Sequence, residues 1–135
     1  MTSRAVDEAD VAVTLAECFR PSGRRLGIVV TIDLPARHID AAASAVGAAG
    51  LMPERRLSRL RPRVGEDSIR AADVADYVER YGHEYGIVVL PDEPAWPARD
   101  RAAITDSCTR QGCELIWVGG DAPNRGGVQV TRSNA

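Results

Sequence analysis

The chain has 135 residues and a formal net charge of −2, and all 17 of its basic residues are arginines. Because the sequence contains no lysine, several classes of function are excluded for it. A P-loop that ends in Gly-Lys-Ser/Thr, Schiff-base catalysis and serine-lysine hydrolysis each depend on a lysine side chain.

The hydrophobic pattern predicts helices that alternate with short strands. Apolar residues at helical spacing indicate the helices, whereas continuous runs such as LGIVVTI and GIVVL are typical of strands buried on both faces. In chain order the predicted elements are helix 5–19, strand 26–32, helix 35–49, a strand within 51–64, helix 68–81, strand 86–90, helix 98–111, strand 114–118 and strand 128–131. Pro91 is expected to end the strand 86–90, and Gly82 and Gly112 to end the helices before them.

This alternation predicts a single α/β domain over residues 1–135. We expect a three-layer sandwich of the flavodoxin or resolvase type, with a mostly parallel sheet of four or five strands and helices on both faces. Residues 1–22 are expected to form an N-terminal helix and linker, and residues 132–135 a loose tail.

Four carboxylates follow the predicted strands. In open parallel sheets ligands bind beyond the carboxyl ends of the strands, so these side chains are a candidate acidic site. They are Asp33, Asp92, Glu93 and Asp121. If they converged they could hold Mg²⁺, which prefers oxygen ligands. Aspartate is also common in turns and helix caps for purely structural reasons, so both interpretations stay open.

A second candidate site is the arginine strip within ERRLSRLRPRV, residues 54–64. Its five arginines are Arg55, Arg56, Arg59, Arg61 and Arg63. Guanidinium groups pair with phosphates, so the strip is consistent with contact to a nucleic-acid backbone or to a protein partner. The alternative is an edge strand that is kept charged against aggregation. No aromatic residue interleaves the strip, so stacking of bases is not indicated.

The remaining signals favour a cytoplasmic protein without cofactors. No apolar run is long enough to span a bilayer, and the acidic N-terminus lacks the core of a signal peptide. Three cysteines without framework spacing indicate reduced, buried thiols. Neither they nor the two histidines have the spacing of a metal site, so we expect no bound metal and no membrane contact.

Two stretches resemble the catalytic domain of resolvase/invertase serine recombinases. They are LGIVVTIDLPARHIDAAASAVGAAGL at residues 26–51 and YGIVVLPDEPAWPARDRAAITDSCTRQGCELIWV at residues 85–118. That family places a nucleophilic serine just after the first strand, where this chain has Thr31 and Asp33. Its Asp-Arg-rich motif is replaced by residues 90–94, LPDEP, and no helix-turn-helix segment follows. The resemblance therefore implies a copy that does not cleave DNA.

The leading functional hypothesis is a non-catalytic cytoplasmic accessory protein that acts through contacts. Its partner would be a protein or a nucleic-acid backbone, with a possible association with DNA transactions or mobile elements through the arginine strip. The first alternative is a small Mg²⁺-dependent hydrolase or phosphotransfer enzyme that uses the carboxylates at the strand ends. The second alternative is a structural subunit of a larger assembly. The sequence alone does not fix the oligomeric state.

Overall fold

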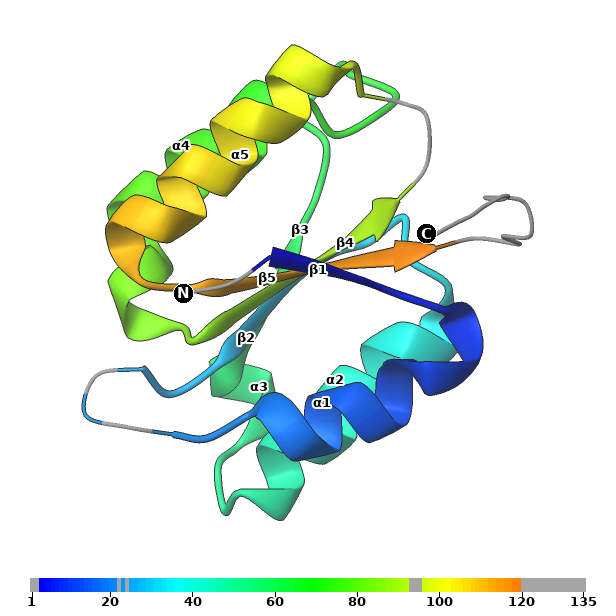
Figure 1. The fold of residues 1–135 in the computed structure, drawn as a ribbon, viewed down its shortest axis with the longest axis vertical. Coiled ribbons are helices and arrows are strands. Elements are labelled where there is room, and N and C mark those ends of the chain that lie inside the picture. Colours follow the sequence, from blue (N-terminus) through cyan, green and yellow to red (C-terminus); the bar gives the residue numbers. More distant parts are fainter. Residues whose placement is uncertain (1–2, 22, 24, 93–95, 120–135) are drawn as a thin grey trace.

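In the computed structural model, five parallel strands form one sheet with helices packed on both faces (Figure 1). The structure describes residues 3–21, 23, 25–92 and 96–119. The strands are β1 (Ser3–Val6), β2 (Ile28–Thr31), β3 (Leu57–Leu60), β4 (Ile87–Asp92) and β5 (Glu114–Gly119). They lie in the order β1-β5-β4-β2-β3, and every pair of neighbours is parallel. This confirms the predicted α/β sandwich.

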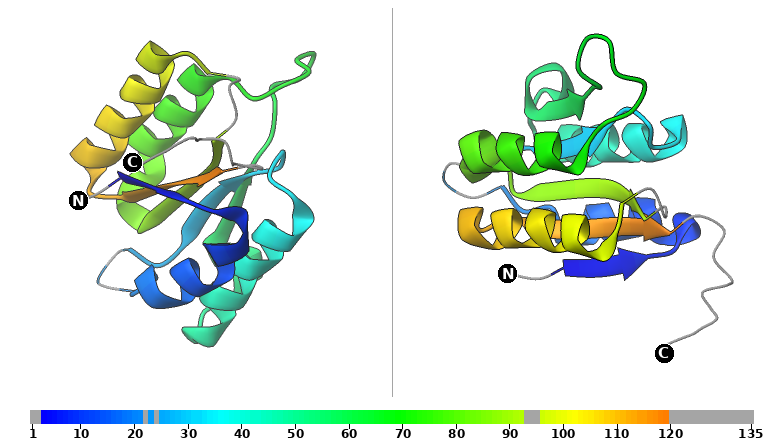
Figure 2. Two further views of the ribbon diagram at one scale, coloured as in Figure 1. Left: turned by 45° about the vertical axis from the view of Figure 1, so that its right-hand side comes forward. Right: turned by 90° about the horizontal axis from the view of Figure 1, so that it is seen from above.

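Two helical layers enclose the sheet (Figures 1 and 2). The helices are η1 (Glu8–Asp10), α1 (Val11–Cys18), α2 (Ala36–Ala48), α3 (Pro53–Arg56), α4 (Ala71–Tyr81), η2 (Gly82–Glu84) and α5 (Ala98–Gln111). One face of the sheet packs on α1 and α2, and the other packs on α4 and α5. Within the described residues, no helix is long and apolar enough to cross a membrane.

Alternate residues of each central strand supply the two cores. In β2, Ile28 and Val30 pack toward α1 and α2, whereas Val29 packs toward α4 and α5. All three side chains have no solvent exposure. This two-sided burial explains why β2 is a continuous apolar run, because neither of its faces meets water.

The N-terminal segment corrects the sequence prediction. Residues 5–7 are not helical, because Ser3–Val6 form the edge strand β1; the 3-10 turn η1 follows at Glu8–Asp10, and α1 begins only at Val11. The hydrophobic pattern does not reveal β1, since Val6 is its single buried residue. An exposed edge strand of this kind shows neither strict alternation nor an apolar run.

Two other boundaries also differ from the prediction. Strand β4 continues through Pro91 to Asp92, and at Pro91 it pairs with β5 but no longer with β2. Proline lacks the backbone N–H, and this end of the strand tolerates its absence because only one neighbouring strand is paired there. Helix α4 begins at Ala71, and no side-chain hydrogen bond caps it. Helix α4 ends at Tyr81 and α5 at Gln111, as predicted. Gly82 follows α4 with a φ of −57° and begins the 3-10 turn η2, whereas Gly112 follows α5 with a φ of 72°. The predicted strand 128–131 and tail 132–135 lie outside the described residues.

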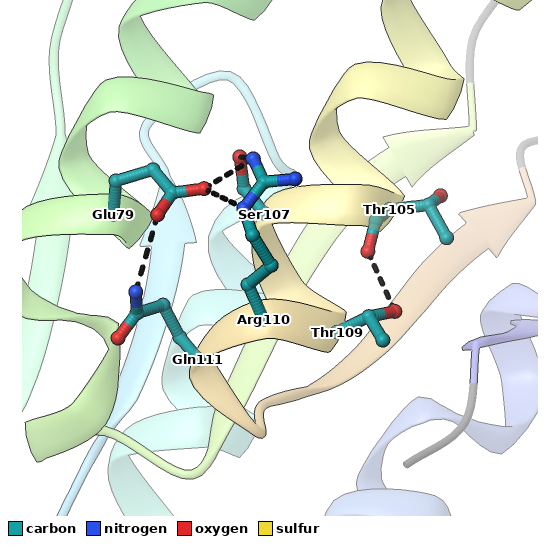
Figure 3. A network of polar contacts seen from close by, with 6 residues as sticks. All are labelled: Glu79, Thr105, Ser107, Thr109, Arg110 and Gln111. Carbon is teal, nitrogen blue, oxygen red and sulfur yellow. Dashed lines mark hydrogen bonds and ion pairs between the residues drawn. The ribbon is translucent and has the colours of Figure 1, made fainter.

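A polar network joins α4 to α5 at their carboxyl ends (Figure 3). The carboxylate of Glu79 accepts a 2.8 Å hydrogen bond from Arg110 Nε, a second bond from the same guanidinium, and a 3.1 Å bond from Gln111 Nε2. The Arg110 guanidinium lowers the pKa of Glu79 below its ordinary value. These contacts tie the two helices to each other at their carboxyl ends.

Candidate functional site

A crevice of about 430 Å³ opens where the chain reverses its direction of winding, between the carboxyl ends of β2 and β4. The connection from β2 leads outward to β3, and the chain then returns past β2 to form β4. This is the topological switch point of an open α/β sheet, at which such folds bind ligands. The crevice is lined by Asp33, Ser68, Ile69, Arg70, Ala71, Pro91, Trp96 and Asp100.

The charged groups of the crevice come from three different segments. Asp33 lies in the turn after β2, Arg70 is the residue before α4, and Asp100 lies in the first turn of α5. Within the described residues, neither Asp33 nor Asp100 forms an ion pair. Arg70 Nε lies 3.8 Å from Asp73 Oδ2, beyond hydrogen-bond distance. The crevice therefore offers one guanidinium and two carboxylates to a ligand.

The apolar wall of the crevice is fixed by aromatic packing. Trp96 meets Trp117 of β5 edge to face, with ring centroids 6.3 Å apart. The guanidinium of Arg101 lies 4.3 Å from the centre of the Trp117 ring and pairs with Asp92. These contacts fix Trp96 on the sheet, so it is a preformed surface on which a flat ligand could pack.

The start of α4 contributes unpaired backbone donors. The first N–H groups of a helix have no partner inside the helix, and within the described residues no side chain caps α4. Together with the positive end of the helix dipole, they favour an anionic group beside Ala71 and Arg70.

Thr31, at the end of β2, has an unsatisfied hydroxyl. Its side chain has no solvent exposure, and its Oγ1 has no hydrogen-bond partner among the described residues. By strand alternation it shares with Val29 the face that α4 and α5 cover, which is also the face of the crevice. Orphaned buried polar groups are uncommon in folded proteins.

Of the four predicted carboxylates, two lie within the described residues. Asp33 lines the crevice, but Asp92 is held by Arg101. Glu93 and Asp121 lie outside the described residues. Among residues 3–21, 25–92 and 96–119, no three His, Cys, Asp or Glu side chains are grouped so as to hold a metal ion.

The arginine strip is divided between two surfaces. In β3, Ser58 bonds to Tyr77 of α4 and Leu60 packs on the same side, so Arg59 between them points to the opposite face with Leu57. Arg55 and Arg56 belong to α3. Only Arg61 and Arg63 line a common cleft beside α4. A contact of all five arginines with one partner stays a prediction.

The cysteines are free thiols, and two of them are buried. Burial raises the pKa of Cys108 to about 12 and that of Cys113 to about 11. Nucleophilic chemistry needs the thiolate, so these two thiols are structural at neutral pH.

Sequence reasoning missed most of the residues that surround Asp33 in the crevice. Asp33 can be found because it directly follows a strand, and Trp96 because it lies between Pro94 and Pro97 in the sequence. Arg70 and Asp100 give no local signal, since each is an ordinary charged residue at a helix start. They become site residues only because the sheet order brings the starts of α4 and α5 beside β2.

Comparison with solved structures supports the class of fold. The crystal structure of SulA from Pseudomonas aeruginosa superposes with a TM-score of 0.53 over 87% of this chain and 98% of that protein, at 16% sequence identity. At this identity the likeness concerns the fold alone. No protein-family model matches the chain.

Among curated proteins, the chain is similar in sequence to kynureninases. It is 32% identical over 111 residues to the Myxococcus xanthus enzyme and 28% identical over 125 residues to that of Eremothecium gossypii. A kynureninase of Salinispora tropica is 36% identical over 72 residues. The first two matches cover 81% and 90% of this chain but only 25% and 28% of those enzymes, so the chain spans about a quarter of their length.

Proposed function

We propose that this domain binds a small zwitterion with a flat ring, such as an aromatic α-amino acid, in the crevice between β2 and β4. The observation that carries the proposal is the set of opposite charges around an apolar wall. Arg70 and the start of α4 suit a carboxylate, Asp33 and Asp100 suit an ammonium group, and Trp96 suits a ring. A ligand that carries both charges matches both ends of the crevice at once.

The kynureninase relatives supply independent support for this class of ligand. Kynurenine, for which those enzymes are named, is an aromatic α-amino acid, so it has both charges and the ring. Since this chain spans only about a quarter of those enzymes, the proposal transfers the kind of ligand and not the reaction. In this proposal the domain is a non-catalytic binding module, as in the leading hypothesis from the sequence.

The other hypotheses from the sequence rest on weaker support. A Mg²⁺-dependent enzyme would need Glu93 or Asp121 to complete a site with Asp33, and both lie outside the described residues. The structural-subunit hypothesis, the cytoplasmic location and the resemblance to resolvases stay predictions from the sequence.

Calorimetric titration tests the proposal directly. We expect L-kynurenine and L-tryptophan to bind to the full chain. Tryptamine and indole-3-propionate, which each lack one charge of the zwitterion, should bind with an affinity lower by about tenfold or more. Arg70→Ala should weaken binding of both amino acids, and Asp33→Asn should weaken them in the same way.

Arg59→Ala is the matched control, because it removes an exposed guanidinium on the opposite face of β3 and should leave amino-acid affinity unchanged. Equal affinity for the zwitterions and for their singly charged analogues would refute the proposal. So would an Arg70→Ala protein that binds as tightly as the unmodified chain.

A further inference from the structure

A second cleft, of about 260 Å³, lies between the end of β3 and α4 and shares one lining residue, Ile69, with the proposed amino-acid site. Its wall combines two tyrosines of α4 with arginines from both elements. The groups used below are Arg61, Arg63, Asp73, Tyr77, Arg80 and Tyr81. The arginines that looked isolated from aromatic residues in the sequence are thus brought beside two rings by the fold.

The aromatic part of this cleft is rigid on one side and open on the other. Tyr77 is fixed by a 2.8 Å hydrogen bond to Ser58 Oγ, and its ring centre lies 4.8 Å from that of Tyr81. Tyr81 itself is 43% exposed. An exposed ring that is supported from behind by a second ring is a platform for stacking.

The charges of the cleft leave one guanidinium available. Arg63 pairs with Asp73 at 2.9 Å and Arg80 pairs with Asp76 at 3.3 Å, so these four groups largely neutralise one another. Arg61 forms no ion pair within the described residues. Its guanidinium can therefore meet an anionic oxygen without first breaking an internal pair.

The carboxylate of Asp73 is engaged by two arginines. One of its oxygens pairs with Arg63 at 2.9 Å, and its buried Oδ2 lies 3.8 Å from Arg70 Nε. The cleft thus presents a stacking ring and a cation to one ligand.

We propose that the cleft between β3 and α4 binds a nucleotide unit, with its base stacked on Tyr81 and its phosphate on Arg61. A base has a flat face that can stack on a tyrosine ring, and the phosphate of the same unit can pair with a guanidinium. The unit could come from a free nucleotide or from a single strand, and both present the same base and phosphate.

Fluorescence anisotropy with a labelled single-stranded oligodeoxynucleotide tests this inference, and a mononucleotide added as competitor distinguishes the two sources. We expect binding at about 50 mM salt that weakens about tenfold in Tyr81→Ala and persists in Tyr81→Phe. Arg61→Ala should weaken binding and reduce the dependence of log Kd on log salt by about 0.7 for each phosphate that the variant no longer neutralises. Thermal unfolding of each variant is the control that checks whether the fold is retained.

Arg59→Ala is again the matched control, since its side chain lies on the other face of β3. This variant should bind the oligonucleotide as the unmodified chain does. If it weakened binding as much as Arg61→Ala does, the result would contradict binding in the cleft and favour contact with the whole arginine strip. Absence of binding to both the oligonucleotide and the mononucleotide would overturn the inference. Preference for a single strand over a mononucleotide would identify the natural ligand as a polymer.

Discussion

At the scale of single residues, the buried hydroxyl of Thr31 lowers the stability of the fold, because its oxygen has no hydrogen-bond partner among the described residues. A Thr31→Val variant removes the unpaired oxygen and retains the shape of the side chain. We expect its free energy of unfolding to rise by about 1 kcal/mol, as measured by urea denaturation, because the variant breaks no hydrogen bond.

Thr31→Ser is the matched control for this prediction. It retains the hydroxyl but removes a buried methyl group, so its stability should fall by about 1 kcal/mol. A Thr31→Val protein that loses stability by a similar amount would show that the hydroxyl is bonded in solution, for example to a buried water.

Between elements, His38 couples helix α2 to the N-terminal turn η1. Its side chain is 3% exposed, and its Nε2 lies 3.7 Å from Glu8 Oε2. Burial is the main cause that lowers the pKa of His38 below its ordinary value of 6.5, and the neighbouring Arg37 adds to it, whereas Glu8 opposes it.

This lowered pKa predicts a loss of stability in mild acid. Below pH 6.5 the unfolded chain takes up a proton at His38 that the folded chain resists, so the free energy of unfolding should fall as the pH drops from about 7.5 to 5.5. Urea denaturation across this range should show the fall in the unmodified chain and in His83→Gln, whose side chain is exposed on η2. His38→Gln should flatten the profile, and an unchanged slope in that variant would assign the effect to other groups.

The elements that the sequence predicted well are those with strong local patterns. Strands β2 and β4 are buried on both faces, so each is a continuous apolar run in the sequence. Helix α5 is followed by Gly112, a residue type that readily adopts the positive φ found there. The edge strand β1 has no such pattern, because it is defined by pairing with β5 at the far end of the chain. Gly27 shows the same limit: a Cβ there would lie 2.4 Å from the carbonyl oxygen of Arg56, a proximity that sequence spacing does not reveal.

At the scale of the whole molecule, both candidate sites arise from the sheet order. The crevice joins residues from the loop after β2, the start of α4 and the start of α5, which are up to 67 positions apart in the sequence, from Asp33 to Asp100. The cleft beside β3 joins arginines to tyrosines of α4 in the same way. Composition and motifs could place Asp33 and Arg61, but their partners depend on which strands are neighbours.

The most direct test of the central claim is to locate amino-acid binding on the isotope-labelled chain by NMR titration with L-kynurenine. The crevice predicts that the largest shift changes occur at the Trp96 indole and at the amides of Asp33, Arg70 and Ala71, with little change at Arg59 or Tyr81. Saturable changes confined to another surface, or no change at any residue of the crevice, would contradict the account.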